Sequence, residues 1–404
     1  MTDDLTTRAR TLLLSTDEPT LLQQVWAYRL LAPASPAVYR PKLTRALVHL
    51  SHSVLDDHAA RHALLAEALE AADGLHPDNP DRNPALHTAL DALQTMHAEF
   101  DDHEQWLTLS RHRVDLARSS GGPAFLAGAL YALATALAGC GRFGEAADAL
   151  HEQRRVLPPT AWDRDRYLPQ LSALLSAAGR PAEAHLAYGE HAARLAAAAT
   201  ESDGHPVLAV RALIQHARLL DRDGRTAKAA GARADAASHL RHLAAVTDQR
   251  SYTVDPDGCA DQLMVAADPD QPAFFLHDGF RTPRARRAVA DRLADLRQRV
   301  DRLGPLAEAD PATHLRPLVD LHRRLTAATA LGITARITTG PGWWQLDPAL
   351  PPADGTVALA ELLTAHGLDP DGSRLAEALL DRACLLTTLR RPADALADLT
   401  RVGG

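Results

Sequence analysis

The phrase Gly141-Arg142-Phe143-Gly144-Glu145-Ala146 recurs along the chain as Gly179-Arg180-Pro181-Ala182-Glu183-Ala184 and as Gly224-Arg225-Thr226-Ala227-Lys228-Ala229. Each copy lies between two runs in which apolar residues recur every three or four positions, which is the period of a helix with one buried face. The phrase itself marks a turn between the two helices. The pattern therefore predicts stacked helical hairpins, because a repeat that cannot bury its own apolar face folds only against its neighbours.

The same apolar period also predicts hairpins that lack the phrase. Apolar stripes of helical period predict hairpins at about residues 36–75, 86–114, 124–158, 168–188 and 213–236. The turn Asp56-Asp57-His58 of the first reappears as Asp101-Asp102-His103 in the second, 45 residues later, which indicates duplication. Pro169 is predicted to shorten or kink its helix, since proline has no amide donor and clashes with the preceding turn.

The third hairpin resembles the tetratricopeptide repeat, a motif of about 34 residues. At the places where that motif takes large, small, glycine and proline residues, this hairpin has Leu130, Leu133, Leu137 and Leu150, then Ala134 and Ala146, then Gly141 and Pro158. Gln153 departs from the motif, which usually has alanine there. The stretch from Trp26 to Pro41 is also similar to the joint between repeats in long bacterial arrays of this family.

The resemblance implies an all-α fold, a right-handed α-solenoid of tetratricopeptide-like hairpins with a degenerate helical region at its C-terminal end. We predict a repeat array over residues 1–245, an irregular interruption over 246–282 and a divergent helical region over 283–404. Helices are expected from Thr282, from about 311 to 331 and from 357 to 366. The last hairpin, 375–399, contains Arg390-Arg391-Pro392-Ala393-Asp394-Ala395, in which arginine replaces the glycine of the phrase.

Composition narrows the classes of function. The formal charge of −8, from 51 acidic and 43 basic residues, gives no basic footprint for nucleic acid. The N-terminus carries acid where a signal peptide carries base, and no apolar run is long enough for a membrane span. Cys140, Cys259 and Cys384 are far apart and odd in number, as in a reducing compartment. We therefore expect a cytoplasmic protein that binds neither nucleic acid nor membrane.

Signatures of catalysis and of cofactors are missing from the sequence. The chain has no phosphate-binding loop, no nucleophile elbow and no familiar zinc spacing among its 20 histidines. His58 with His62, and His239 with His242, stand at helical spacings that could share a face. Asp255-Pro-Asp-Gly and Asp369-Pro-Asp-Gly start like calcium loops but lack the acid at the twelfth position. We predict a protein that is not an enzyme and holds no cofactor or metal.

The candidate partner-binding residues follow from the resemblance. Its repeats line a concave groove with five side chains of the first helix, and in the fifth hairpin these are Arg211, Ile214, Arg218, Asp221 and Arg222. Three guanidiniums on one helical stripe could grip a carboxylate or a phosphate by forked hydrogen bonds. The alternative is a solvated arginine face in an arginine-rich protein.

Trp343 and Trp344 form the second candidate, because indole rings are frequent at interaction hot spots. The alternative is a plug packed against the neighbouring hairpin. The function expected from the family is non-catalytic binding of a protein or peptide, as a scaffold or as the sensing arm of a regulator. Two alternatives remain: a small-molecule or peptide-signal sensor closed by residues 246–282, or the repeat part of a longer regulator whose effector domain lies elsewhere.

Overall fold

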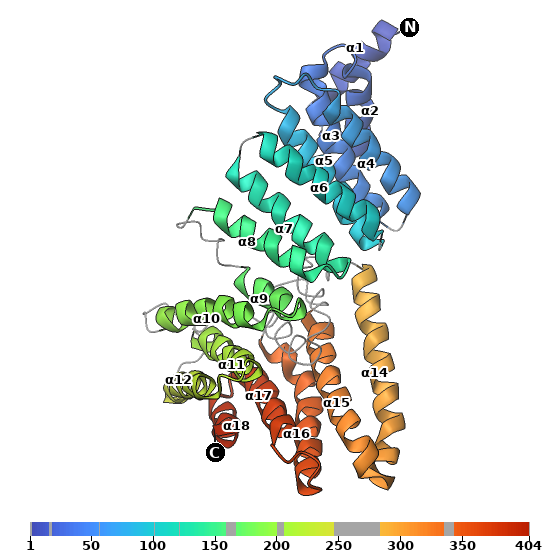
Figure 1. Cartoon of the computed structure of the whole chain (residues 1–404). Helices are drawn as coiled ribbons and strands as arrows, with labels where there is room; N and C mark the ends of the chain where they lie inside the picture. Colours follow the sequence, from blue (N-terminus) through green and yellow to red (C-terminus); the bar gives the residue numbers. More distant parts are fainter. Residues whose placement is uncertain are drawn as a thin grey trace. The chain divides into compact units, whose positions relative to one another are not determined.

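The computed structural model describes residues 2–15, 18–55, 57–100, 102–120, 122–158, 167–199, 206–245, 283–334 and 343–403. The described residues form helices joined by turns (Figure 1). Contacts divide the chain into two compact units. Unit 1 comprises residues 1–140 and 148–159, and unit 2 comprises residues 141–147 and 160–404. This division falls inside the predicted array, and the predicted boundary at residue 245 stays a prediction.

From the first to the seventh, the helices of unit 1 each pack against the next. They are α1 (Thr2–Leu13), α2 (Leu21–Leu31), α3 (Pro36–Ser51) with the short 3-10 helix η1 (His52–Val54), α4 (His58–Asp73), α5 (Arg82–Glu99), α6 (His103–Ser120), α7 (Pro123–Gly139) and part of α8 (Phe143–Val156). The hairpins predicted at residues 36–75 and 86–114 are confirmed as α3–α4 and α5–α6. Helices α2 to α5 share one apolar core, which contains Leu47, Leu65 and Met96.

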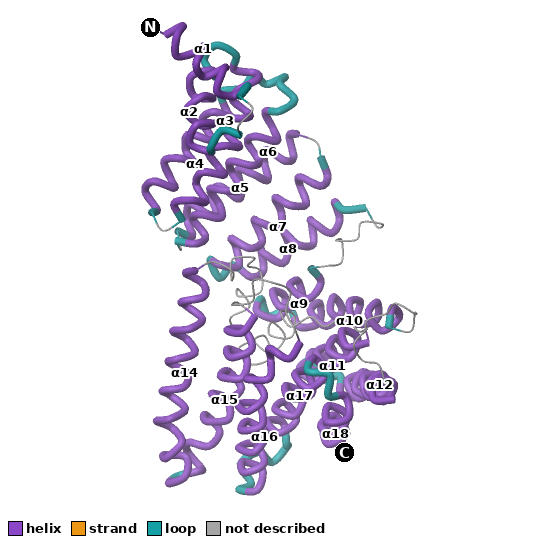
Figure 2. The backbone as a smooth tube through the Cα atoms, turned by 180° about the vertical axis from the view of Figure 1, so that it is seen from behind, coloured by secondary structure: helices purple, strands orange, loops and turns teal. Residues whose placement is uncertain are grey.

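Unit 2 continues the helical pattern. Its helices are α9 (Leu168–Ala177), α10 (Pro181–Ala198), α11 (Pro206–Arg222), α12 (Thr226–Ala245), α14 (Pro283–Ala309), α15 (Pro311–Thr334), the 3-10 helix η5 (Trp343–Ala349), α16 (Leu350–Ala365), α17 (Ser373–Thr388) and α18 (Pro392–Gly403). Figure 2 shows the same elements from behind as helices joined by loops. The predicted all-α fold built from helical hairpins is confirmed.

The recurring phrase is explained by backbone conformation at its glycine. Gly141, Gly179 and Gly224 have φ angles of 71°, 72° and 71°. Only glycine takes this left-handed conformation without a steric cost. The next amide then reaches back into the finished helix, as in the N–H of Arg225, which donates to the Leu220 carbonyl at 2.8 Å. This bond satisfies a carbonyl that the helix end would otherwise leave without a partner.

The rest of the phrase has physical reasons as well. Arg180 Nε and Nη2 each donate to a carboxylate oxygen of Glu183 at 2.7 Å, which clasps the start of α10. The closing alanine is fully buried, as Ala184 and Ala229 show, because only a small side chain fits between the packed helices. The phrase is therefore a structural unit of turn, clasp and close packing.

The last hairpin reproduces this turn without glycine. Arg390 adopts φ of 58° in the place of the glycine, and the N–H of Arg391 donates to the Leu386 carbonyl at 2.8 Å. Ala395 is fully buried, like the alanines of the earlier copies. The predicted kinship of residues 390–395 with the phrase is thus confirmed in backbone geometry.

The spatial order of unit 2 differs from its order along the chain. Helix α17 packs against α11, and α18 packs against α12, although α14, α15 and α16 lie between them in sequence. One apolar core joins Leu213 and Ile214 of α11 with Leu380 of α17 and Leu399 of α18. Figure 1 shows α17 beside α11 on one side and α16 on the other. The last hairpin therefore stacks on the fifth hairpin.

Two local expectations are corrected. Pro169 does not kink a helix, since it lies in the first turn of α9, where an amide donor is not needed; the helix is short, as predicted. Helix α16 begins at Leu350 instead of Val357, because Pro351 and Pro352 occupy its first turn. The predicted irregular interruption at residues 246–282 lies outside the described residues.

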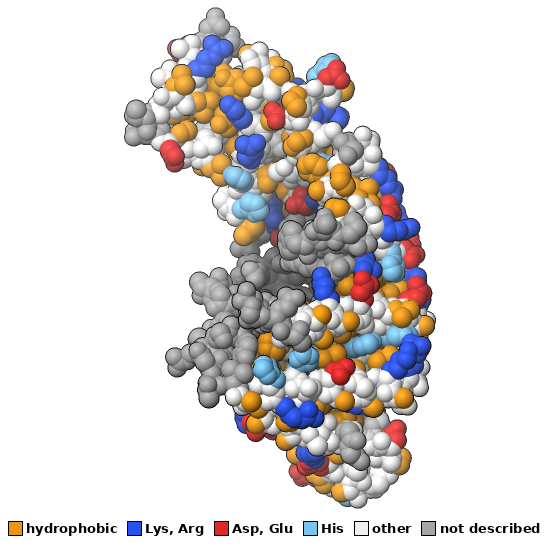
Figure 3. All heavy atoms as spheres, turned by 90° about the vertical axis from the view of Figure 1, so that its left-hand side faces the viewer, with side chains coloured by type: hydrophobic (Ala, Val, Ile, Leu, Met, Phe, Trp, Pro, Cys, Tyr) orange, Lys and Arg blue, Asp and Glu red, His pale blue; other side chains and the backbone are white. Residues whose placement is uncertain are grey.

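Surface charge is mixed on the face drawn in Figure 3, where basic and acidic side chains lie interspersed with apolar ones. Among the described helices, none is both long enough and apolar enough to cross a membrane.

Candidate functional site

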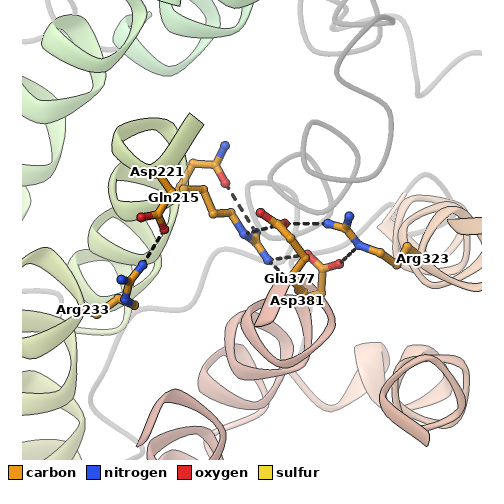
Figure 4. Close-up of polar contacts among 7 residues, drawn as sticks. Gln215, Asp221, Arg233, Arg323, Glu377 and Asp381 are labelled. Carbon is orange, nitrogen blue, oxygen red and sulfur yellow. Dashed lines mark hydrogen bonds and ion pairs between the residues drawn. The ribbon is translucent and has the colours of Figure 1, made fainter. Parts of the chain in front are cut away.

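The most concentrated polar site of unit 2 is a buried ion cluster where α11, α15 and α17 meet. Helix α11 contributes Arg218, α15 contributes Arg323, and α17 contributes Glu377 and Asp381. Figure 4 shows the two carboxylates of α17 lying between α11 and Arg323. Glu377 and Asp381 stand four residues apart, so the helix presents both on one face.

Arg218 is the centre of the cluster, and its side chain is fully buried. Its Nη2 donates to Asp381 Oδ1 at 2.6 Å and to the main-chain carbonyl of Glu377 at 3.2 Å. Its Nε lies 3.3 Å from Glu377 Oε2, and its Nη1 lies 3.5 Å from Gln215 Oε1. A buried guanidinium needs such partners, because burial of an unpaired charge is very costly.

Arg323 completes the cluster from the other side. Its Nε donates to Asp381 Oδ2 at 2.7 Å, and its Nη2 donates to Glu377 Oε2 at 2.8 Å. Each carboxylate therefore binds both guanidiniums, and the four formal charges cancel. At this point α11, α15 and α17 are held together by polar contacts in place of apolar ones.

The ionised forms are favoured in spite of burial. Burial alone would raise the pKa of the Glu377 carboxyl, but Arg218, Arg323 and Arg222 outweigh it and lower that pKa. Burial would lower the pKa of Arg218, whereas Asp381 and Glu377 raise it. The charged forms of Glu377 and Arg218 are therefore favoured. The ion pairs of the cluster join α11, α15 and α17.

The predicted groove residues are placed differently from the expectation. Arg211, Ile214 and Arg218 are buried, with 2%, 0% and 1% of their surface exposed. The expected open arginine stripe is therefore wrong for these positions, because α17 packs against α11 and supplies carboxylates to Arg218 from within the chain. Whether any part of this face takes an external partner stays a prediction.

The two remaining groove candidates lie at the end of α11. Asp221 is half-buried and binds Arg233 of α12 at 2.5 Å between Oδ2 and Nη1. This ion pair holds the Arg233 guanidinium at the contact between α11 and α12. Arg222 is exposed, and it is the member of the predicted arginine stripe that a partner can still reach.

Trp343 and Trp344 begin the 3-10 helix η5, which precedes α16. Their side chains lie outside the described residues, so both the interaction role and the alternative of a packed plug stay predictions. Leu346, three residues after Trp343, is fully buried in a core with α15 and α16.

Sequence reasoning missed the acidic half of the cluster. A signal for it was present, since Glu377 and Asp381 stand four residues apart, on one face of a helix rich in alanine and leucine. Two carboxylates on such a stripe require cations from neighbouring helices. The periodicity could not say which helices would supply them. In the described part of the chain, no group of three or more His, Cys, Asp or Glu side chains is placed to hold a metal ion.

Exposed aromatic and aliphatic side chains form a second feature that the sequence analysis did not single out. On α2, Leu22 and Trp26 stand four residues apart and expose 68% and 37% of their surface. The opposite side of the same helix buries Val25, Ala27 and Leu31. Helix α2 therefore carries apolar side chains on both its buried and its exposed sides.

Comparison with known proteins gives no family for this chain. No protein-family model matches it, and no curated protein matches it. Among solved structures it is similar to one titled "Structure of Naa15/Naa10 bound to HypK-THB", with 14% identity and a TM-score of 0.30. That match covers 95% of this chain, which spans 63% of the other. A circular tandem repeat protein with novel repeat topology matches at 15% identity and a TM-score of 0.21, covering 99% of this chain and 89% of that one. Both TM-scores are below 0.5, and no property of either protein is carried over to this chain.

Proposed function

We propose that this chain is a non-catalytic scaffold or regulatory sensing module of the tetratricopeptide type, which binds a segment of a protein partner in the cytoplasm. The observation that carries the proposal is the exposed Leu22–Trp26 stripe on a helix of the repeat array. In such an array all hairpins have similar turns and cores. Recognition of a partner therefore depends on exposed side chains that differ from one hairpin to the next. Exposed apolar groups rimmed by polar ones are typical of interaction surfaces.

The surroundings of the stripe suit a protein segment. Trp26 offers a large rigid contact area, and tryptophan is among the residues that most often dominate binding energy at interfaces. Arg29, one turn further along α2, is held by Glu67 of α4, with its Nε 2.6 Å from Glu67 Oε1. The stripe is therefore bordered by a fixed polar pair. An apolar side chain of a partner helix or extended segment would cover the indole while polar groups at the rim stay hydrated.

Affinity capture from cell extract followed by titration calorimetry with the purified partner tests the proposal. Trp26→Ala should weaken binding by about 2 kcal/mol, the usual threshold of a hot spot. Leu362→Ala is the matched control, because Leu362 is an apolar side chain of similar exposure on α16 of unit 2. Equal binding by Trp26→Ala and the unmodified chain would contradict the proposed surface.

A separate substitution tests the predicted arginine stripe of α11. Arg222→Gln removes the charge of the exposed member of the predicted stripe. Because Arg222 also helps to lower the pKa of Glu377, the neutral side chain is used, and an unchanged unfolding curve is the control for the ion cluster. Arg218→Glu is unsuitable, because it would place a third carboxylate among Glu377 and Asp381 and disrupt the fold. If Arg222→Gln leaves the affinity for the partner unchanged while Trp26→Ala lowers it, binding is on unit 1 and the groove proposal fails.

A further inference from the structure

Three imidazole rings lie together where the start of α4 meets the end of α5. His58 and His62 stand one turn apart on α4, and His97 lies two residues before the end of α5 at Glu99. The ring centroids are 6.2 Å apart for His58 and His62, 6.4 Å for His58 and His97, and 5.9 Å for His62 and His97. The three rings thus form a nearly equilateral triangle between two helices, which we call the histidine triangle.

His97, one member of the histidine triangle, contacts the turn that leads into α6. His97 is buried, with 6% of its surface exposed, and its Nδ1 lies 2.9 Å from Asp102 Oδ2. Asp102 is the residue before α6. Its main-chain carbonyl accepts the N–H of Trp106 at 3.0 Å, and its Oδ1 accepts the N–H of Gln105 at 3.4 Å. The contact between His97 and Asp102 therefore fixes the turn between α5 and α6.

The other charged groups of α4 and α5 near the triangle are already engaged. Arg61 of α4 is buried and forms an ion pair with Glu99 of α5. Asp57 precedes α4, and its carboxylate accepts the N–H of Ala60 at 2.9 Å. Asp102 is thus the carboxylate in direct contact with the imidazoles.

Helices α3 and α6 also pack against α5. On α3, Lys42, Arg45 and His49 are exposed, and the Arg40 guanidinium lies against Gly74, at the other end of α4 from His58. His52, in the short helix η1 after α3, is exposed too. At the start of α6, His103 and Glu104 are exposed. Apart from Arg40, these side chains are exposed to solvent.

His97 packs against both of the other rings. His97 meets His58 and His62 at interplanar angles of 77° and 82°, an edge-to-face arrangement that suits uncharged aromatic rings. Burial lowers the pKa of His97; its hydrogen bond to Asp102 opposes this, and charge on His62 and His58 lowers the pKa further. The rings are not placed to converge on a metal ion in the described residues. The imidazole nitrogens of the triangle can take up protons.

We propose that the histidine triangle is an acid-sensitive joint between α4 and α5. Histidine gains charge in the mildly acidic range, because its ordinary titration lies near pH 6.5. When the rings are protonated, up to three positive charges lie about 6 Å apart, and in the part of the chain that the structure describes the Asp102 carboxylate contacts one of them. Their repulsion separates the start of α4 from the end of α5 and so loosens unit 1 at the contact between two of its hairpins.

Hydrogen exchange of the full chain, measured by mass spectrometry at about pH 7.5 and about pH 5.5 with intrinsic rates corrected, tests the joint. Amides at the start of α4 and at the α5–α6 turn should lose protection about tenfold at the lower pH, the factor that corresponds to one pKa unit. The double variant His58→Gln, His62→Gln keeps polar side chains at these exposed positions and should abolish most of that loss. His112→Gln, an exposed histidine on α6, is the matched control and should behave as the unmodified chain.

Two outcomes would overturn the proposal. The first is unchanged protection of both segments at the lower pH in the unmodified chain. The second is an equal loss of protection in the double variant, which would assign the acid response to other histidines such as His87. The single variant His62→Gln should give an intermediate loss, because it removes two of the three ring contacts and leaves His97 beside His58.

Discussion

Arg218 on α11 donates a hydrogen bond of 2.6 Å to Asp381 on α17, a residue 163 positions later in the chain. Both side chains are buried, and Arg323 of α15 binds the same carboxylate. This contact joins the last hairpin to the fifth hairpin and gives Arg218, one residue of the predicted binding stripe, partners within the chain. The consequences can be tested by mutation.

Removal of the acidic partner should destabilise unit 2 strongly. Asp381→Ala leaves Arg218 and Arg323 with one carboxylate between them, and loss of one partner of a buried pair costs about 3–5 kcal/mol. Denaturant unfolding of the full chain, followed by fluorescence and circular dichroism, measures the change. Glu361→Ala, which breaks an exposed ion pair with Arg401, is the control and should cost no more than about 1 kcal/mol. Equal effects of the two substitutions would contradict the burial of the cluster.

The turn at Arg390 offers a substitution that should stabilise the protein. Arg390→Gly relieves a left-handed conformation that costs a residue with a Cβ atom about 1–2 kcal/mol. The gain should be nearer the lower figure, because glycine also gives the unfolded chain more freedom. The reverse change at the matched position, Gly224→Ala, should destabilise the protein, since Gly224 has φ of 71°. Thermal unfolding of both variants checks the opposite signs.

A close approach between α10 and α11 gives a third prediction. A Cβ atom at Gly189 would lie 2.8 Å from Nε2 of His216 and 3.0 Å from its Cε1. Gly189→Ala should therefore cost about 1–3 kcal/mol, the range for an overpacked core. His216→Ala should suppress most of this cost when the two substitutions are combined. Purely additive unfolding free energies in the double variant would show that the two residues do not meet.

Acid should lower the stability of unit 2 through His322. Burial lowers the pKa of this half-buried imidazole, while a hydrogen bond with Pro352 opposes the shift. The unfolded chain then takes up a proton near pH 6.5 more readily than the folded chain does. The stability is full above about pH 6.5 and falls as the pH drops from there through the folded value. In a pH series of unfolding curves, His322→Gln should reduce this fall, and an unchanged series would contradict the assignment.

Much of the fold could be predicted from the sequence because its signals are local. The glycines at 141, 179 and 224 mark left-handed turns, as in the hairpin α11–α12. The apolar period marks helices, and it alone predicted the hairpins α3–α4 and α5–α6. Periodicity indicates that a helix buries a face, but it does not indicate against which helix. The pairing of α11 with α17 spans an intervening run of helices and depends on long-range packing.

The candidate site was harder to predict for the same reason. The arginine stripe of α11 was recognised, but a guanidinium has the same sequence signature whether it faces solvent or a buried carboxylate. Only Glu377 and Asp381, two acids one turn apart on α17, gave a hint of the joint, and their partners lie on two other helices. For the histidine triangle, His58 and His62 were paired by spacing, whereas His97 joined them through the packing of α5 on α4.

A double-mutant cycle between Arg218 and Asp381 tests most directly whether α17 is joined to α11 by this ion cluster. Arg218→Met and Asp381→Leu are measured singly and together by denaturant unfolding of the full chain. We predict that the double variant is more stable than the sum of the single losses implies, with a coupling of about 1–3 kcal/mol, because residues in one buried network do not add. Additive losses, with a coupling below about 0.5 kcal/mol, would contradict the contact and with it the stacking of the last hairpin on the fifth.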